Sequence, residues 1–125
     1  MHFAVGTDII PVSRMVALMS GGHGFRRWFT PAEADYCDAK RAPAQHYAAR
    51  LAAKEAVVKA LQERWDYVPY AEIEIRQPGR EAPTVQLHGH TAEIAAAQGV
   101  TDISVSLSHC EDYATATALV LRAAL

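Results

Sequence analysis

The chain has 125 residues, half of them hydrophobic, which is enough apolar material for one core. A chain of this length corresponds to one domain that buries roughly two-thirds of its unfolded surface, so we predict a single domain over residues 1–125. The formal net charge of -2 excludes a general electrostatic attraction for nucleic acid or for an anionic membrane surface. A site for an anionic ligand must therefore be built locally.

The cysteines and the first 20 residues indicate a cytoplasmic protein. Cys37 and Cys110 lie far apart and lack the Cys-x-x-Cys spacing, which argues against a zinc knuckle and against a disulfide framework. Residues 1–20 include Asp8 and Arg14 and no continuous apolar run, so we expect neither a signal peptide nor a membrane span there. In the cytoplasm we expect both cysteines to be reduced.

The chain is predicted to open with a strand that leads into a helix. The apolar segment 3–10 favours a strand that ends at Pro11, which places Asp8 near the strand end. Proline is accepted in the first turn of a helix, and apolar residues recur at helical spacing over 12–19. Gly21-Gly22 then ends the pattern.

Two further helices are predicted before residue 65. Thr30-Pro31-Ala32-Glu33 has the pattern of a capping box with proline in the first turn, so a helix is expected from there to about Cys37. Residues 45–64 are rich in alanine, leucine, lysine and glutamate and contain no glycine or proline. This segment is the strongest helix prediction in the chain.

The second half of the chain is predicted to hold two hairpins and a short helix. Apolar and polar residues alternate over 73–76 and again over 84–87, which indicates a hairpin. An alanine-rich helix over 91–98 is closed by glycine. Alternation over 103–108 and 113–121 predicts the second hairpin. Helices and antiparallel hairpins without βαβ regularity predict an α+β fold, with the hairpins packed against the long helix.

The long helix carries charged residues that a solvated face does not explain. Lys54 interrupts its apolar stripe, which also contains Leu51, Val58 and Leu61. Because an unpaired buried ammonium is costly, Lys54 must snorkel to solvent, pair with an acid or meet a ligand phosphate. Glu55 and Lys59 stand at i and i+4, which is also the spacing of an ordinary surface ion pair.

Taken together, these segments resemble a known enzyme family. The motifs are Gly6-Thr7-Asp8-Ile9-Ile10 with Arg14, Phe29-Thr30 with Glu33, Arg50-Leu51-Ala52-Ala53-Lys54-Glu55-Ala56 with Lys59-Ala60, and Ser106-Leu107-Ser108-His109. In this order, over most of the chain, they resemble the holo-acyl-carrier-protein synthases, the small 4′-phosphopantetheinyl transferases. The resemblance implies that family's α+β fold. It also implies transfer of the 4′-phosphopantetheine group from coenzyme A to a serine of an apo acyl carrier protein, with release of 3′,5′-ADP.

The resemblance implies a magnesium site on two carboxylates. Asp8 and Glu55 would bind Mg²⁺, which commonly takes one or two protein carboxylates and completes its octahedron with water and substrate phosphates. Lys59 would bind a pyrophosphate oxygen or protonate the leaving group. The general base is either Glu55 or a metal-activated water, and the sequence leaves both open.

Further residues are implied as ligands of coenzyme A and of the carrier. Candidates for the coenzyme A phosphates are Arg50, Lys54, Lys59, Ser106, Ser108 and His109. The serines are equally consistent with the solvated face of a strand, and His109 with a histidine satisfied in a turn. A basic surface for an acidic carrier would use Arg14, Arg26 and Arg27. We interpret the His88-x-His90 pair as surface residues, because no third metal ligand is in view.

The chain departs from the family pattern at two places. Ala4 stands where a glycine is common, and Gln62-Glu63-Arg64-Trp65 replaces a glycine-containing loop. The second change suggests a specialised acceptor, in fatty-acid, polyketide or another pathway, that the sequence does not identify. The family's homotrimer, with sites between neighbouring subunits, is expected by resemblance. Two alternatives stay open: a catalytically silent module that binds carrier and coenzyme A, and a magnesium-dependent phosphohydrolase that acts on coenzyme A.

Overall fold

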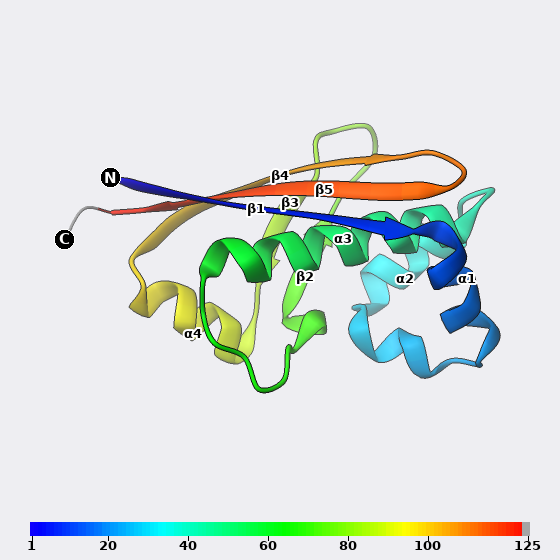
Figure 1. Cartoon of the computed structure of the whole chain (residues 1–125), viewed down its shortest axis with the longest axis horizontal. Coiled ribbons are helices and arrows are strands. Elements are labelled where there is room, and N and C mark those ends of the chain that lie inside the picture. Colours follow the sequence, from blue (N-terminus) through cyan, green and yellow to red (C-terminus); the bar gives the residue numbers. More distant parts are fainter. Residues whose placement is uncertain (124–125) are drawn as a thin grey trace.

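A three-stranded antiparallel sheet forms one layer of the protein (Figure 1). The computed structural model describes residues 1–123. The sheet contains β1 (His2–Pro11), β5 (Tyr113–Arg122) and β4 (Val100–His109) in the order β1-β5-β4. The C-terminal strand is therefore central, and β1 and β4 are the two edges. Asp8 lies opposite Ala116 in this register.

Helix α3 (Pro43–Leu61) packs along one face of the sheet and supplies much of the core (Figure 1). Its small alanines let the strands approach closely. A Cβ atom at Gly6 of β1 would overlap the carbonyl of Ala56 and would lie 2.8 Å from the amide nitrogen of Ala60. Because only glycine fits there, Gly6 sets the distance between β1 and α3, and with it the position of Asp8 two residues later.

The other elements surround the two ends and one side of α3 (Figure 1). Helices α1 and α2 lie near its first turn and α4 near its last, and β2 and β3 form a separate antiparallel hairpin. Two short 3₁₀ helices, η1 and η2, complete the chain. The bounds are α1 Val12–Ser20, η1 Gly24–Trp28, α2 Pro31–Asp38, η2 Tyr70–Glu72, β2 Ile73–Arg76, β3 Thr84–Leu87 and α4 Gly89–Ala97.

The predicted α+β architecture with two antiparallel hairpins is confirmed. The capping box of α2 forms as expected: Thr30 Oγ1 accepts from the Glu33 amide, and Glu33 Oε1 accepts from the Thr30 amide. The predicted extent of the long helix was wrong at its end. The helix stops at Leu61, three residues earlier than predicted, because Gln62 adopts the left-handed conformation with φ of 57°.

On the outer face of the sheet, which faces away from α3, the exposed side chains of β1 are largely apolar. Phe3, Val5 and Ile9 of β1 are more than 60% exposed, and Leu119 of β5 lies opposite Val5. Large exposed apolar patches of this kind usually mark a surface that another molecule covers. Within residues 1–123, no helix is both long and apolar enough to cross a membrane.

Candidate active site

Asp8 and Lys59 meet where β1 passes over the last turn of α3. Lys59 Nζ lies 3.2 Å from Asp8 Oδ1 and donates a hydrogen bond of 2.9 Å to the carbonyl oxygen of Thr7. The Asp8 carboxylate is about four-fifths buried, whereas the Lys59 side chain is half exposed. The lysine therefore partly neutralises this carboxylate and still faces solvent.

Glu55 lies one turn before Lys59 on α3 and is held by Tyr70. The Tyr70 hydroxyl donates a hydrogen bond of 2.6 Å to Glu55 Oε1. Burial, this hydrogen bond and the negative charges of Glu55 and Asp8 together raise the pKa of Tyr70 well above its ordinary value, so the phenol stays protonated as a donor. Glu55 stands one helical turn before Lys59, whose ammonium contacts Asp8, so Lys59 links the two carboxylates into one local cluster.

The cluster of Asp8, Glu55, Lys59 and Tyr70 fits a magnesium ion in its donor chemistry. Among the hydrogen bonds of the described residues, each carboxylate uses one oxygen, Asp8 Oδ1 toward Lys59 and Glu55 Oε1 toward Tyr70. The second oxygen of each is left for a cation. Mg²⁺ prefers such hard oxygen ligands and commonly needs only one or two carboxylates from the protein. Residues 1–123 contain no group of three or more His, Cys, Asp or Glu side chains that could hold a metal ion, so protein side chains alone would not complete the coordination of an ion here.

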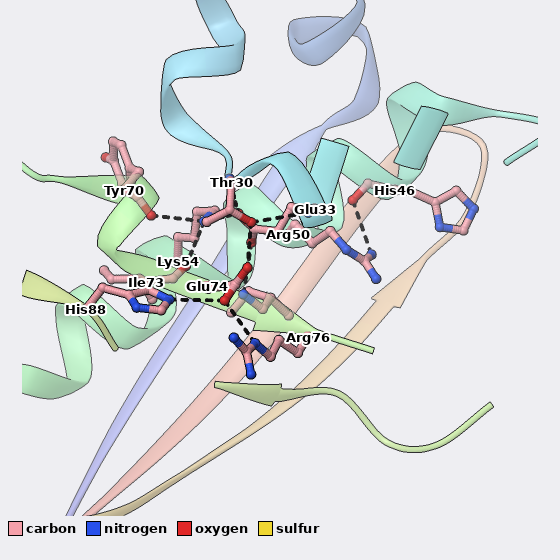
Figure 2. Close-up of polar contacts among 11 residues, drawn as sticks. Thr30, Glu33, His46, Arg50, Lys54, Tyr70, Ile73, Glu74, Arg76 and His88 are labelled. Atoms are coloured by element: carbon pink, nitrogen blue, oxygen red, sulfur yellow. Dashed lines mark hydrogen bonds and ion pairs between the residues drawn. The ribbon is translucent and has the colours of Figure 1, made fainter. Parts of the chain in front are cut away.

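Lys54 is not placed as a ligand of coenzyme A, and this prediction must be corrected. Its ammonium is fully buried and donates to Glu33 Oε1 at 2.8 Å and to the carbonyl oxygens of Tyr70 at 2.9 Å and Ile73 at 2.6 Å (Figure 2). All three ammonium hydrogens are thus used inside the protein. Of the three alternatives that the sequence left open, the structure selects pairing with an acid.

Glu74 of β2 lies beside this ion pair in a second buried network (Figure 2). It accepts from Thr30 Oγ1 at 2.7 Å and from Arg76 Nε at 2.9 Å, and its Oε1 lies 3.0 Å from His88 Nε2. Burial opposes the charged form, but the hydrogen bonds from Thr30, His88 and Arg76 outweigh it and lower the pKa of Glu74 to about 2. His88 therefore has a structural partner, whereas His90 lies at the surface beside Glu93.

Arg50 and His109 share a small cavity under the β4 edge of the sheet. The cavity has a volume of about 170 Å³ and is lined by Tyr36, His46, Arg50, Gln77, Pro83, Leu107 and His109. Arg50 as a whole is 2% exposed, and its guanidinium carbon lies 4.0 Å from the Tyr36 ring centroid, while Nη2 donates to Gln77 Oε1 at 3.1 Å. Its Nε has no partner, and no carboxylate in the described chain pairs with it. A buried guanidinium without a carboxylate partner is a suitable binding group for an anionic ligand.

His46 also lines that cavity and lies against His109. Its ring centroid lies 4.7 Å from that of His109, edge to face. Burial, together with the nearby positive charges of His109, Arg50 and Lys40, lowers the pKa of His46 to about 4. His46 is therefore neutral at pH 7 and can donate or accept one hydrogen bond per ring nitrogen.

The two serines of the terminal motif do not join Arg50. Leu107 and His109 line the cavity, and because side chains alternate along a strand, Ser106 and Ser108 point to the other face of β4. There they lie opposite Thr117 and Thr115. The structure thus brings His109, but not Ser106 or Ser108, next to Arg50.

The cluster of Asp8, Glu55, Lys59 and Tyr70 and the Arg50 cavity lie on opposite flanks of α3. Arg50 and Lys59 are separated by about 180° around the helix at its usual 100° per residue. Asp8 belongs to one edge strand, β1, and His109 to the other, β4. Within one chain, the Asp8–Lys59 cluster and the Arg50 cavity therefore face different sides of the molecule.

The three arginines expected at a carrier surface differ in their surroundings. Arg14 on α1 is exposed, and its positive charge partly opposes the rise in the pKa of Tyr70. Arg27 is exposed and lies 5.5 Å from the Trp28 ring centroid. Arg26 is half-buried and pairs with Asp38 at 3.1 Å, so part of its charge is already used.

Tyr70, His46 and Gln77 lie at these sites although the sequence motifs do not include them. Tyr70 and Gln77 lie in segments with no periodicity that would aim their side chains. His46 stands four residues before Arg50 on the same helix, and this spacing alone predicts neighbouring side chains. Of these three residues, His46 is therefore the one that could have been predicted from the sequence as a neighbour of Arg50.

Comparison with known proteins identifies the class to which this fold and site belong. The family model of the 4′-phosphopantetheinyl transferase superfamily matches residues 4–118, and the chain belongs to that superfamily. Within it, the chain is 41% identical to the holo-[acyl-carrier-protein] synthase of Desulforudis audaxviator over 97% of this chain and 94% of that one. It is 44% identical to the Moorella thermoacetica protein of the same name over 92% and 91% of the two chains.

Solved structures agree with this assignment. A Chronobacterium ammoniagenes ACPS–CoA complex superposes with a TM-score of 0.89 at 29% identity, covering 99% of this chain and all of that one. The holo-[acyl-carrier-protein] synthase of Neisseria meningitidis superposes with a TM-score of 0.85 at 28% identity, over 95% and 98% of the chains. The resemblance seen in the sequence motifs is thereby confirmed.

Proposed function

We propose that this protein transfers the 4′-phosphopantetheine group of coenzyme A to a serine hydroxyl of an apo acyl carrier protein and releases 3′,5′-ADP. The observation that carries the proposal is the contact of Lys59 on α3 with Asp8 on β1, one helical turn after Glu55 and at a partly open position. Relatives at 41–44% identity are named holo-[acyl-carrier-protein] synthases. We therefore assign to this cluster the reaction for which those relatives are named.

Asp8 and Glu55 would hold Mg²⁺ through the carboxylate oxygens that Lys59 and Tyr70 do not use. When bound, the ion offsets the negative charge that develops on the pyrophosphate as its bond to the leaving group breaks. Lys59 binds a pyrophosphate oxygen or donates a proton to the departing phosphate, since its half-exposed ammonium can turn from Asp8 toward substrate. Positioning and charge stabilisation supply most of the rate.

The proton of the serine hydroxyl goes either to Glu55 or to a water in the cluster. Glu55 keeps one carboxylate oxygen without a hydrogen bond among the described residues, which supports its candidacy. The half-exposed surroundings of the cluster support a water equally well. Both routes remain part of the proposal.

The Arg50 cavity is the proposed site for a phosphate of coenzyme A, including the 3′-phosphate. Arg50 has a buried guanidinium without an acidic partner in the described chain, and His109 lies in the same cavity. Charge-assisted hydrogen bonds to phosphate are among the strong ones. Ser106 and Ser108 lie on the opposite face of β4 from the Arg50 cavity. We therefore do not assign them as ligands of a coenzyme A bound to Arg50 of the same chain.

We propose a homotrimer in which each active site is shared by neighbouring subunits. One chain places its Asp8–Lys59 cluster and its Arg50 cavity on opposite flanks of α3, so one coenzyme A reaches both types of group most simply across an interface. The exposed apolar side chains of Phe3, Val5 and Ile9 offer a surface for that contact. Light scattering should give three times the monomer mass, and Val5→Lys should lower it. A monomeric wild-type protein would contradict the shared site.

The carrier would dock on the basic surface that begins at Arg14 and continues to Arg27 and the partly paired Arg26. Attraction between this surface and an acidic carrier is screened by salt over about 8–10 Å. We expect kcat/KM for the carrier to fall as salt rises. An unchanged kcat/KM would contradict this docking surface.

The deciding experiment mixes the protein with coenzyme A, Mg²⁺ and a panel of apo carriers, and weighs each carrier by mass spectrometry. We expect one carrier to gain one phosphopantetheine group and expect Asp8→Ala or Glu55→Ala to abolish the gain. Loss of coenzyme A without carrier modification indicates the phosphohydrolase. Intact coenzyme A and unmodified carriers indicate the silent binding module.

The panel also addresses the acceptor. It should include carriers of fatty-acid and of polyketide synthesis, because residues 62–65 differ from the family pattern. We further propose that residues 1–125 act as one transferase domain in the cytoplasm. The two cysteines, buried Cys37 and exposed Cys110, are free, which is compatible with a reducing compartment.

A further inference from the structure

The hydroxyl group of Tyr70 lies in a position that no step of the proposed transfer has used. It is on η2, a 3₁₀ turn that follows the divergent loop after α3, yet it donates a short hydrogen bond of 2.6 Å to Glu55. Fifteen residues separate the two. A contact between a loop and a proposed metal ligand requires the loop backbone to be fixed.

The backbone of Tyr70 is fixed by the buried ion pair. Lys54 Nζ donates 2.9 Å to the Tyr70 carbonyl oxygen and is itself paired with Glu33 at 2.8 Å (Figure 2). Lys54 and Glu55 are consecutive on α3. Lys54 binds the carbonyl oxygen of Tyr70, and Glu55 accepts the hydrogen bond of the Tyr70 hydroxyl. The Tyr70 ring also packs edge to face against Trp28, with centroids 6.4 Å apart.

This arrangement limits how Glu55 can turn. A free glutamate has three side-chain torsions and loses rotamer entropy when a cation fixes it. With Oε1 held by Tyr70, the carboxylate presents Oε2, which accepts no hydrogen bond within residues 1–123. Hydrogen bonds of this kind orient metal ligands, and their loss commonly weakens metal binding about 10–100-fold.

We propose that Tyr70 is a positioning residue that holds Glu55 as a one-oxygen ligand for the divalent ion. The inference rests on the proposed function, since it concerns the same cluster. It assigns to the loop between α3 and β2 a role in metal affinity, and it gives the buried Glu33–Lys54 pair a purpose beyond stability, because that pair anchors the Tyr70 backbone.

The test is Tyr70→Phe, which removes the hydroxyl and keeps the ring against Trp28. Mn²⁺ binding is followed by electron paramagnetic resonance with coenzyme A present, and carrier modification is followed as Mg²⁺ is titrated. We expect the Mn²⁺ dissociation constant and the Mg²⁺ concentration for half-maximal rate to rise about 10-fold. We expect the rate at saturating Mg²⁺ to fall far less and the melting temperature to stay near that of the wild type.

Two controls separate positioning from a general effect. Tyr67→Phe removes a hydroxyl from a 71% exposed tyrosine of the same loop and should leave both quantities unchanged. In a Glu55→Gln background, adding Tyr70→Phe should weaken Mn²⁺ binding no further, because its effect runs through Glu55. Further weakening in that background would overturn the inference.

The failure of this inference differs from the failure of the proposed function. If the wild type binds Mn²⁺ with coenzyme A and Tyr70→Phe binds it equally well, only the role of Tyr70 is wrong. If the wild type binds no Mn²⁺ in the presence of coenzyme A, the proposed function fails and the role of Tyr70 fails with it.

Discussion

The ammonium of Lys59 lies 3.2 Å from the carboxylate of Asp8, although 51 residues separate them. The same ammonium donates to the carbonyl oxygen of Thr7, so α3 is joined to β1 by two contacts at one point. Because the lysine side chain is half exposed, this ion pair contributes at most about 1 kcal/mol to stability. Its position matters for chemistry more than for the fold.

Lys59→Met should therefore separate activity from stability. Loss of the ammonium removes a donor to the pyrophosphate, and removal of one such electrostatic contact typically lowers kcat about 10²–10³-fold. The free energy of unfolding should change by less than about 1 kcal/mol. Steady-state kinetics and urea unfolding measure the two quantities. Near-normal kcat in a destabilised variant would make Lys59 a structural residue.

Lys54→Met should have the opposite effect. It leaves the Glu33 carboxylate buried without its cation, and breaking a buried pair in this way costs about 3–5 kcal/mol. Urea unfolding should show this loss, and Glu33→Gln combined with Lys54→Met should recover part of it. Unchanged stability with a raised KM for coenzyme A would restore Lys54 to the phosphate ligands.

Arg50→Met should discriminate between coenzyme A and the analogue that lacks the 3′-phosphate. A hydrogen bond to a charged group contributes about 1.5–3 kcal/mol, which corresponds to a KM for coenzyme A raised about 10–100-fold. The KM for the analogue should not change between wild type and variant. Arg80→Met, at an exposed position, is the matched control. Equal effects on both substrates would place the 3′-phosphate elsewhere.

Glu74 should make the protein sensitive to acid. Burial raises its pKa, but hydrogen bonds from Thr30, His88 and Arg76 lower the folded value to about 2, below the ordinary 4.5 of the unfolded chain. The stabilisation is complete above pH 4.5 and is lost as the pH falls from 4.5 toward 2, with a total of about 3 kcal/mol.

The comparison with Glu74→Gln isolates this contribution. Between pH 4.5 and pH 3, the free energy of unfolding from urea titration should fall more steeply for the wild type than for the variant. Parallel curves for the two proteins over that interval would show that the Glu74 network does not set the acid limit.

Local patterns predicted the elements of the fold well, because each has its own signal. The capping box at Thr30 and Glu33 and the alternation in β4 act over a few residues, and the structure contains both elements. Pairing of β1 with β5 joins the two ends of the chain, and no local pattern encodes it. The early end of α3 depends on one left-handed residue, Gln62, at which the sequence offers no glycine.

The site was only partly predictable for the same reason. Asp8, Glu55 and Lys59 stood out as charged residues in family motifs, and the fold brings Lys59 to Asp8, one helical turn after Glu55. Lys54 is also a charged residue in a family motif. Its partner Glu33 comes from a different helix, so only the fold could show that the ammonium is buried. Tyr70 lacks any pattern, and its role depends on a backbone contact with Lys54.

The central claim is that Asp8 and Glu55, from distant segments, bind one divalent ion together with coenzyme A. Its most direct test is the anomalous scattering of Mn²⁺ in crystals grown with Mn²⁺ and coenzyme A. We predict one peak in contact with a carboxylate oxygen of each residue and with the pyrophosphate. Bound coenzyme A whose pyrophosphate lies away from both carboxylates, or a peak that contacts neither of them, would contradict the account.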